Sequence, residues 1–149
     1  NSSIPKGYVQ NGTLRLTGNT VLTLAPGTYY FPGGVDMLGT SQLNVTGKTR
    51  IVLGGGKSTV SGNGIVNQTN VAANLRIDIV GVEAEFTGNS SLYADIYAPT
   101  ADLTVNGDSG FYGAMFAKTV NLSGHASRVH GDESLRREYD ETTRSKLKE

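Results

Sequence analysis

The sequence predicts an all-β fold: a single-stranded, right-handed parallel β-helix (β-solenoid) with a C-terminal α-helix. Three observations lead to this prediction. Residues 88–124 hold two consecutive copies of one unit, a glycine-bearing corner motif recurs along most of the chain, and the composition changes at about residue 128. The first two predict stacked turns of β-structure, and the third predicts a terminal helix.

The repeated unit reads GNSSLYADIYAPTADLTVNG over residues 88–107 and GDSGFYGAMFAKTVNLSG over residues 107–124. The alignment pairs residues 92–98 with 111–117 and residues 103–107 with 120–124. The spacing between matched positions is 19 residues and then 17. A period near 18, with short alternating apolar runs and glycine turns, is typical of one solenoid turn.

The corner motif consists of an apolar strand end, then Thr, Ser or Asn, then Gly. It occurs as LRLTGN, LNVTGK, STVSGN, AEFTGN, LTVNGD and VNLSGH, with its glycines at 18, 47, 62, 88, 107 and 124. The wider early spacing predicts a second corner or a loop in some turns. We expect the solenoid to span about residues 8–127 in six or seven turns.

Strict alternation identifies the faces of the strands. Leu75, Ile77 and Ile79 fall on one face, and Arg76 and Asp78 fall on the other. By the same pattern the inward positions of the repeated unit are Leu103, Val105, Val120 and Leu122. The segment LAPGTYYF at 24–31 predicts a strand, a Pro-Gly turn and a second strand.

The division into parts follows the composition. We expect a β-solenoid domain over 1–127 and a charged C-terminal helix or cap over 128–149, a stretch that carries 12 of the 26 charged residues. The helix is predicted from about Asp132, a suitable N-cap, to Arg144, lightly packed through Leu135 and Tyr139. A contact helix for a partner is the alternative interpretation.

The composition excludes several classes of function. The 13 basic and 13 acidic residues cancel, so nothing indicates binding to nucleic acid, and no cysteine is available for disulfides or thiolate metal sites. No apolar run approaches the length of a membrane span. Because Asn1 is not a natural first residue, we expect a processed or excised piece of a larger protein.

Two histidines are the first candidates for chemistry. His125 or His130, with Asp108 or Asp132, could form a metal site or an acid–base pair. A zinc site needs three or four ligands at suitable spacing, and this spacing offers none that is recognisable. The favoured interpretation is an exposed turn residue and a histidine hydrogen-bonded near a helix start. We therefore assign no catalytic, cofactor-binding or metal-binding residue and no cofactor.

The acidic residues give a second candidate. Asp95, Asp102 and Asp108 could meet on neighbouring strands, as the clustered carboxylates of a glycan-cleaving β-helix would. Isolated, solvent-facing acids are the simpler interpretation. The Gly54-Gly55-Gly56 run precedes Lys57-Ser58, but a strand pattern follows, which argues against a phosphate-binding loop.

Aromatic residues take matching positions in the two units: Tyr93, Tyr97, Phe111, Tyr112 and Phe116. Stacked aromatic ladders often fill solenoid cores, so we expect these side chains in the core. An exposed platform that stacks on sugars is the alternative.

The chain resembles a family of predicted right-handed β-helix domains of unknown function in bacterial secreted and pilus-associated proteins, often behind a PilX-like segment. The resemblance is carried by LAPGTYYF at 24–31, SLYADIYAPTADLTVNG at 91–107, GFYGAMFAKTVNLSG at 110–124 and the HGDESL ending at 130–135. Gly131 stands where that family has Tyr. The resemblance implies a surface setting and no catalytic residue.

Together these observations favour a non-enzymatic extracellular structural or adhesive module of a larger pilus-associated or cell-surface protein. Its partners would be other surface or pilus proteins or a surface ligand, with a glycan as one option. Two alternatives stay open: a carbohydrate-active β-helix, and a solenoid that polymerises through its coil ends.

Overall fold

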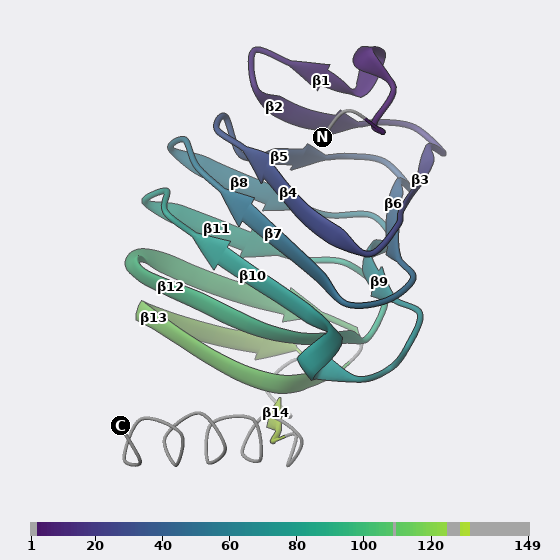
Figure 1. The fold of residues 1–149 in the computed structure, drawn as a ribbon. Coiled ribbons are helices and arrows are strands. Elements are labelled where there is room, and N and C mark those ends of the chain that lie inside the picture. Colours follow the sequence, from purple (N-terminus) through teal and green to yellow (C-terminus); the bar gives the residue numbers. More distant parts are fainter. Residues whose placement is uncertain (1–2, 109, 125–128, 132–149) are drawn as a thin grey trace, which may run out of the picture.

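The computed structural model describes residues 3–108, 110–124 and 129–131, and their strands stack into a β-solenoid of about 5 turns (Figure 1). Every strand pairing in it is parallel except the one between β1 (Val9–Gln10) and β2 (Thr13–Leu16). The predicted fold class is therefore confirmed, while the right-handed sense of the coil stays a prediction. The predicted helix from Asp132 to Arg144 lies outside the described residues, as does the proposed boundary at 127.

Each early turn has three sides, which we name in chain order. The first side holds β2, β5 (Val35–Met37), β8 (Lys57–Val60) and β11 (Glu83–Phe86). The second side holds β3 (Val21–Leu24), β6 (Gln42–Val45) and β9 (Gly64–Asn67). The third side holds β4 (Gly27–Phe31), β7 (Thr49–Leu53) and β10 (Leu75–Ile79).

The last two turns lack the second side. β12 (Leu92–Gly107) and β13 (Phe111–Gly124) are long strands whose first halves continue the third side and whose second halves continue the first side. β14 (Val129–His130) begins one more layer on β13. Short helical turns, η1 (Lys6–Tyr8) and η2 (Ala72–Asn74), precede β1 and β10.

The loss of the second side explains the uneven period. Leu14 pairs with Val35, 21 residues later, whereas Leu103 pairs with Val120, 17 residues later. The first turns are longer because each carries an extra strand, so the chain forms about 5 turns and not the six or seven expected. The prediction of an additional corner in the early turns is confirmed.

The recurring glycines were not all equivalent. Gly18, Gly62 and Gly88 follow strands of the first side, and Gly107 and Gly124 are the last residues of β12 and β13 on that side, but Gly47 follows β6 on the second side. On the first side, the glycine that follows β5 is Gly39, which the corner motif does not include. A β-carbon on Gly62, whose φ is +71°, would lie 2.7 Å from the carbonyl oxygen of Gly39, so the turns stack backbone on backbone at this corner.

The core is a column of aliphatic side chains inside the coil. Ile51, Ile77 and Ile96 occupy one register position on successive strands, and each is at most 1% exposed. Leu75, Ile77 and Ile79 point inward as predicted, and Arg76 and Asp78 lie on the outer face. Burying such a side chain stabilises the fold by roughly 1.5–3 kcal/mol.

The predicted inward positions of the repeated unit hold only in part. Leu103 and Val105 are buried, whereas Val120 is 44% exposed and Leu122 is half-buried. The register is right, because Val120 pairs with Leu103 and Leu122 with Val105. The difference is one of position: an inward side chain needs a turn on both sides, and among the described residues this stretch has a turn on one side only.

The N-terminal end of the core is covered. β1 folds back antiparallel on β2, Ile4 is buried, and Tyr8 and Val9 pack against the core. This hairpin covers the edge of β2 on the first side, while among the described residues β3 and β4 each pair with one strand only, β6 and β7.

Candidate functional site

The structure does not bring the three predicted acids together. Asp95 lies on the outer face of the third side, and Asp102 lies on the first side, across the bend of β12. Asp108 follows β12 at the next corner. A glycan-cleaving pair needs two carboxyl groups on either side of one bond, and the bends place these three side chains on different parts of the turn.

Instead, the outer face of the third side carries an arginine cluster, which consists of Arg50, Arg76, Asp78 and Asp95. Arg50 and Arg76 are register neighbours on β7 and β10, so their like charges lie side by side. The carboxylate of Asp78 lies between them: Arg50 Nε donates to Oδ2 at 2.5 Å, and Arg76 Nε donates to Oδ1 at 3.0 Å. Arg76 Nη1 donates to Asp95 Oδ2 at 2.8 Å.

The charges within the arginine cluster are balanced by ion pairs. Two guanidinium groups face two carboxylates, and the Asp78 side chain is only 9% exposed. Burial by itself lowers the pKa of Arg76, but its hydrogen bonds and charge interactions with Asp78 and Asp95 outweigh burial, so the pKa of Arg76 lies above its ordinary value. The carboxylate of Asp78 is thus occupied by ion pairs with both arginines.

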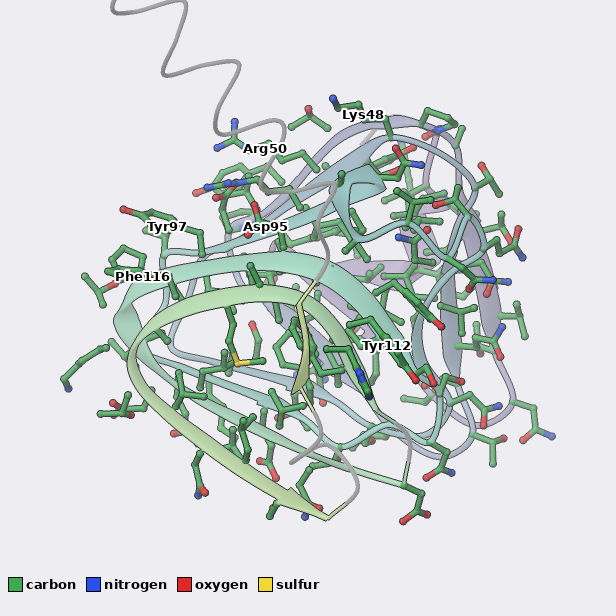
Figure 2. All side chains as sticks on the ribbon, turned by 90° about the horizontal axis from the view of Figure 1, so that it is seen from below. Lys48, Arg50, Asp95, Tyr97, Tyr112 and Phe116 are labelled. Carbon is green, nitrogen blue, oxygen red and sulfur yellow. The ribbon has the colours of Figure 1, made fainter. Side chains whose placement is uncertain are left out.

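A stack of rings lies beside the arginine cluster, outside the coil (Figure 2). Tyr97 on β12 and Phe116 on β13 are register partners with ring centroids 5.5 Å apart and planes inclined by 17°. The guanidinium carbon of Arg76 lies 5.3 Å from the centroid of Tyr97. Tyr97 therefore has a cation on one side and a ring on the other, a favourable arrangement for both neighbours.

The prediction that the aromatic residues fill the core is right for Phe111, which is buried, and wrong for Tyr97 and Phe116, which are 42% and 60% exposed. Ile96 and Ala98 occupy the inward positions on either side of Tyr97, so alternation turns the ring outward. The alternation of residues 92–98 already contained this signal.

A second stack runs through Tyr93, Tyr112 and His130. The ring centroids of the two tyrosines are 4.5 Å apart, and those of Tyr112 and His130 are 4.7 Å apart. His130 thus serves as the next ring of a ladder. The other proposed partners of a histidine site, His125 and Asp132, lie outside the described residues.

The first side carries a lysine cluster that sequence reasoning missed. Lys57 Nζ lies 2.8 Å from Glu83 Oε1 and 2.9 Å from Glu85 Oε2, and hydrogen bonds to these two carboxylates raise the pKa of Lys57. The spacing Glu-x-Glu on a strand signalled that both acids share a face, but only the parallel register of β8 and β11 places Lys57 beside them.

Two further candidate sites can be assessed. Lys57 and Ser58 lie in β8, as the strand pattern predicted, so the three preceding glycines form a corner and not a phosphate cradle. Over residues 3–108, 110–124 and 129–131, no three His, Asp or Glu side chains gather as a metal site would require.

A small apolar hollow marks the place where the second side ends. It is lined by apolar side chains, by four glycines and by Ser90; the apolar residues are Val60, Ile65, Phe86, Leu92, Val105 and Phe111. No titratable group lines it, so it has the character of a packing gap left by the missing strand.

The comparisons with known proteins identify a family but no individual relative. Neither the curated proteins nor the solved structures gave a match. Within the described residues, no helix has the length and hydropathy needed to cross a membrane. The family model described as "Domain of unknown function (DUF7305)" matches residues 33–138, which is more than half of the chain, so the chain belongs to this family of domains of unknown function.

Proposed function

We propose that the chain is a non-enzymatic structural or adhesive module that acts by contact, as one part of a larger extracellular, pilus-associated or cell-surface protein. The observation that carries the proposal is the pairing of its charged side chains. The acids that could support chemistry on the third side are engaged by Arg50 and Arg76, and Asp102 is engaged by Thr119 and Lys118. Catalysis needs at least two tuned groups around one reacting atom.

The ring stacks favour a protein surface over a glycan as the partner. Sugars bind aromatic residues through the faces of the rings. The faces of Tyr97 are taken by Arg76 and Phe116, and those of Tyr112 by Tyr93 and His130. Phe116 is 60% exposed and has a described ring neighbour on one face only, Tyr97. Elsewhere the lateral face presents ring edges and paired charges, which suit a protein contact better than sugar stacking.

The surface and pilus setting rests on the resemblance of residues 91–107 and 110–124 to secreted β-helix domains. A rigid solenoid with short corners suits such a setting, because each turn supports only its neighbours and the whole acts as a spacer. Expression of the full-length protein in its bacterial host, followed by protease treatment of intact cells, tests the setting. Cleavage of this domain on intact cells is the expected result, and full protection would contradict it.

Turnover assays test the absence of catalysis. The purified chain should not degrade polygalacturonate, alginate, hyaluronan or peptidoglycan, with or without calcium. The Asp95→Ala, Asp102→Ala and Asp108→Ala variants serve as controls. Turnover by the parent chain that disappears in one of these variants would replace the contact module by the carbohydrate-active alternative.

A further inference from the structure

The C-terminal end of the described solenoid has apolar side chains that every earlier turn buries. Met115, Ala117 and Leu122 are partly buried, and Val120 is 44% exposed. Their register partners on β12 are buried: Ile96, Ala98, Leu103 and Val105. The end of β13 therefore presents inward side chains of the core to whatever lies next to it.

The backbone of β13 offers an edge at the same place. Its partner on one side is β12 along nearly the whole strand, and β14 pairs only with Phe111 and Tyr112 on the other side. For residues 113–123 the part of the chain that the structure describes supplies no second strand. An edge of this length, without proline and with Lys118 as its only charged residue, is a template for strand addition.

The shape of this edge is self-complementary. β13 bends at Lys118, between the arm 113–117 on the third side and the arm 119–123 on the first side, and the two arms have equal length. A two-fold axis at the bend would lay the arm 113–117 of one copy antiparallel to the arm 119–123 of the other. Contacts of this isologous kind are the commonest in homo-oligomers.

The register of such a pairing follows from which side chains of β13 point inward. Paired residues must both point inward, so the axis passes between Lys118 and Thr119. Ala117 then lies opposite the partner's Val120, and Met115 lies opposite the partner's Leu122. The two cores become continuous through the interface.

We propose that the chain forms a two-fold dimer through β13 at the C-terminal end of the solenoid. The opposite end favours this over a head-to-tail polymer, because the antiparallel β1 occupies the edge of β2 on the first side, where the arm 119–123 of a second copy would have to pair. The dimer deepens the proposed contact function by naming one contact surface, and it rests on that function.

Sedimentation velocity from about 1 μM to about 1 mM tests the proposal, since a small interface associates weakly. The chain should approach twice its monomer mass with rising concentration. Val120→Lys should raise the dissociation constant at least about tenfold, because it places a charge in the apolar centre of the contact. Val82→Lys is the matched control: Val82 is 65% exposed at the same corner two turns before β13, and its substitution should leave the mass unchanged.

A cross-link locates the contact. The chain has no cysteine, so Lys118→Cys introduces a single thiol beside the proposed axis, within disulfide reach of its counterpart. Mild oxidation should give a covalent dimer with Lys118→Cys and not with Val82→Cys. A monomer at every concentration, or equal cross-linking of the two variants, would overturn the proposal. Either result would leave the turnover assays, and with them the contact function, unaffected.

Discussion

Asn67 donates a hydrogen bond from its side-chain Nδ2 to the carbonyl oxygen of Tyr93, at 3.0 Å, and so joins the last strand of the second side, β9, to β12. The same amide nitrogen donates to the carbonyl oxygen of Val71, and Oδ1 accepts from the backbone and the hydroxyl of Thr69. Asn67 is buried and takes an inward position on β9 where the earlier turns have Leu24 and Val45. One side chain thus holds the turn that follows β9 and joins it to β12.

Replacing this amide should destabilise the solenoid. Asn67→Ala removes its hydrogen bonds to the carbonyl groups of Tyr93 and Val71 and to the backbone N–H of Thr69, of which the Val71 carbonyl keeps the bond from the Asn74 N–H. The expected cost is about 2–3 kcal/mol of the free energy of unfolding. Urea unfolding followed by circular dichroism measures the change. Asn63→Ala is the control, because Asn63 Nδ2 makes one solvent-accessible bond to the Thr40 carbonyl, and it should cost less than about 0.5 kcal/mol.

Two buried serines should respond in opposite directions to the same substitution. Among the described residues, the hydroxyl of Ser41 is buried without a hydrogen-bond partner, whereas the hydroxyl of Ser58 accepts a bond from the backbone N–H of Val35 at 3.2 Å. Ser41→Ala removes an unsatisfied polar group and should stabilise the fold by about 0.5–1 kcal/mol. Ser58→Ala orphans a buried N–H and should cost about 1–2 kcal/mol.

Thermal unfolding of both variants checks these signs. A change of 1 kcal/mol corresponds to roughly 2–4 °C in Tm for a chain of this size. A lower Tm for Ser41→Ala would mean that its hydroxyl is satisfied in solution, for example by a bound water molecule.

Much of the fold could be predicted because local sequence patterns determine the strands and turns of a solenoid. The alternation of Leu75, Ile77 and Ile79 fixed the faces of β10, and the matched units fixed the register of β12 on β13, residue for residue. The number of turns was harder to predict. Gly47 and Gly18 look alike in sequence, and only the parallel pairing of whole strands reveals that they belong to different corners.

The candidate site was less predictable because its contacts join residues of different turns. Arg50 and Asp78 are 28 residues apart and meet only because β7 and β10 are neighbours in that register. No local sequence pattern predicts such an ion pair when the turns differ in length. The alternation of residues 92–98 indicates an outward Tyr97, whereas the frequency of aromatic ladders in solenoid cores favours an inward one.

Asp78 should be the most important acid for stability. Its carboxylate separates the neighbouring guanidinium groups of Arg50 and Arg76. Asp78→Asn keeps the shape and removes the charge, so the two cations repel each other. Because both arginines are about half-exposed, the expected cost is moderate, about 1–2 kcal/mol in urea unfolding.

Asp36→Asn is the matched control for this substitution. Asp36 pairs with Arg15 at 3.9 Å, and both side chains are well exposed. Its loss should change the free energy of unfolding by less than about 0.5 kcal/mol. Equal effects of the two substitutions on the free energy of unfolding would contradict the prediction that Asp78 contributes more to stability than an exposed acid.

The pKa of Asp102 should report the contact between β12 and β13. Thr119 Oγ1 donates to Asp102 Oδ1 at 2.7 Å, and Lys118 Nζ lies 3.6 Å from the same oxygen. The hydrogen bond from Thr119, followed by the charge of Lys118, holds the pKa of Asp102 below its ordinary value. A depressed pKa means that the ionised carboxylate favours the folded state. This contribution to stability is fully present above the pKa that Asp102 has in the unfolded chain. It is lost as the pH falls through the lower pKa that Asp102 has in the folded chain.

Thr119→Val should therefore raise the pKa of Asp102 toward its ordinary value and move the onset of acid unfolding to higher pH. A titration of the side-chain carboxyl carbon by NMR measures the first effect, and circular dichroism at falling pH measures the second. Thr104→Val is the control, since Thr104 lies on the same outer face of β12 and its register partner is Asn121, not Thr119. An unchanged pKa in Thr119→Val would mean that solvent, and not the neighbouring turn, sets the ionisation of Asp102.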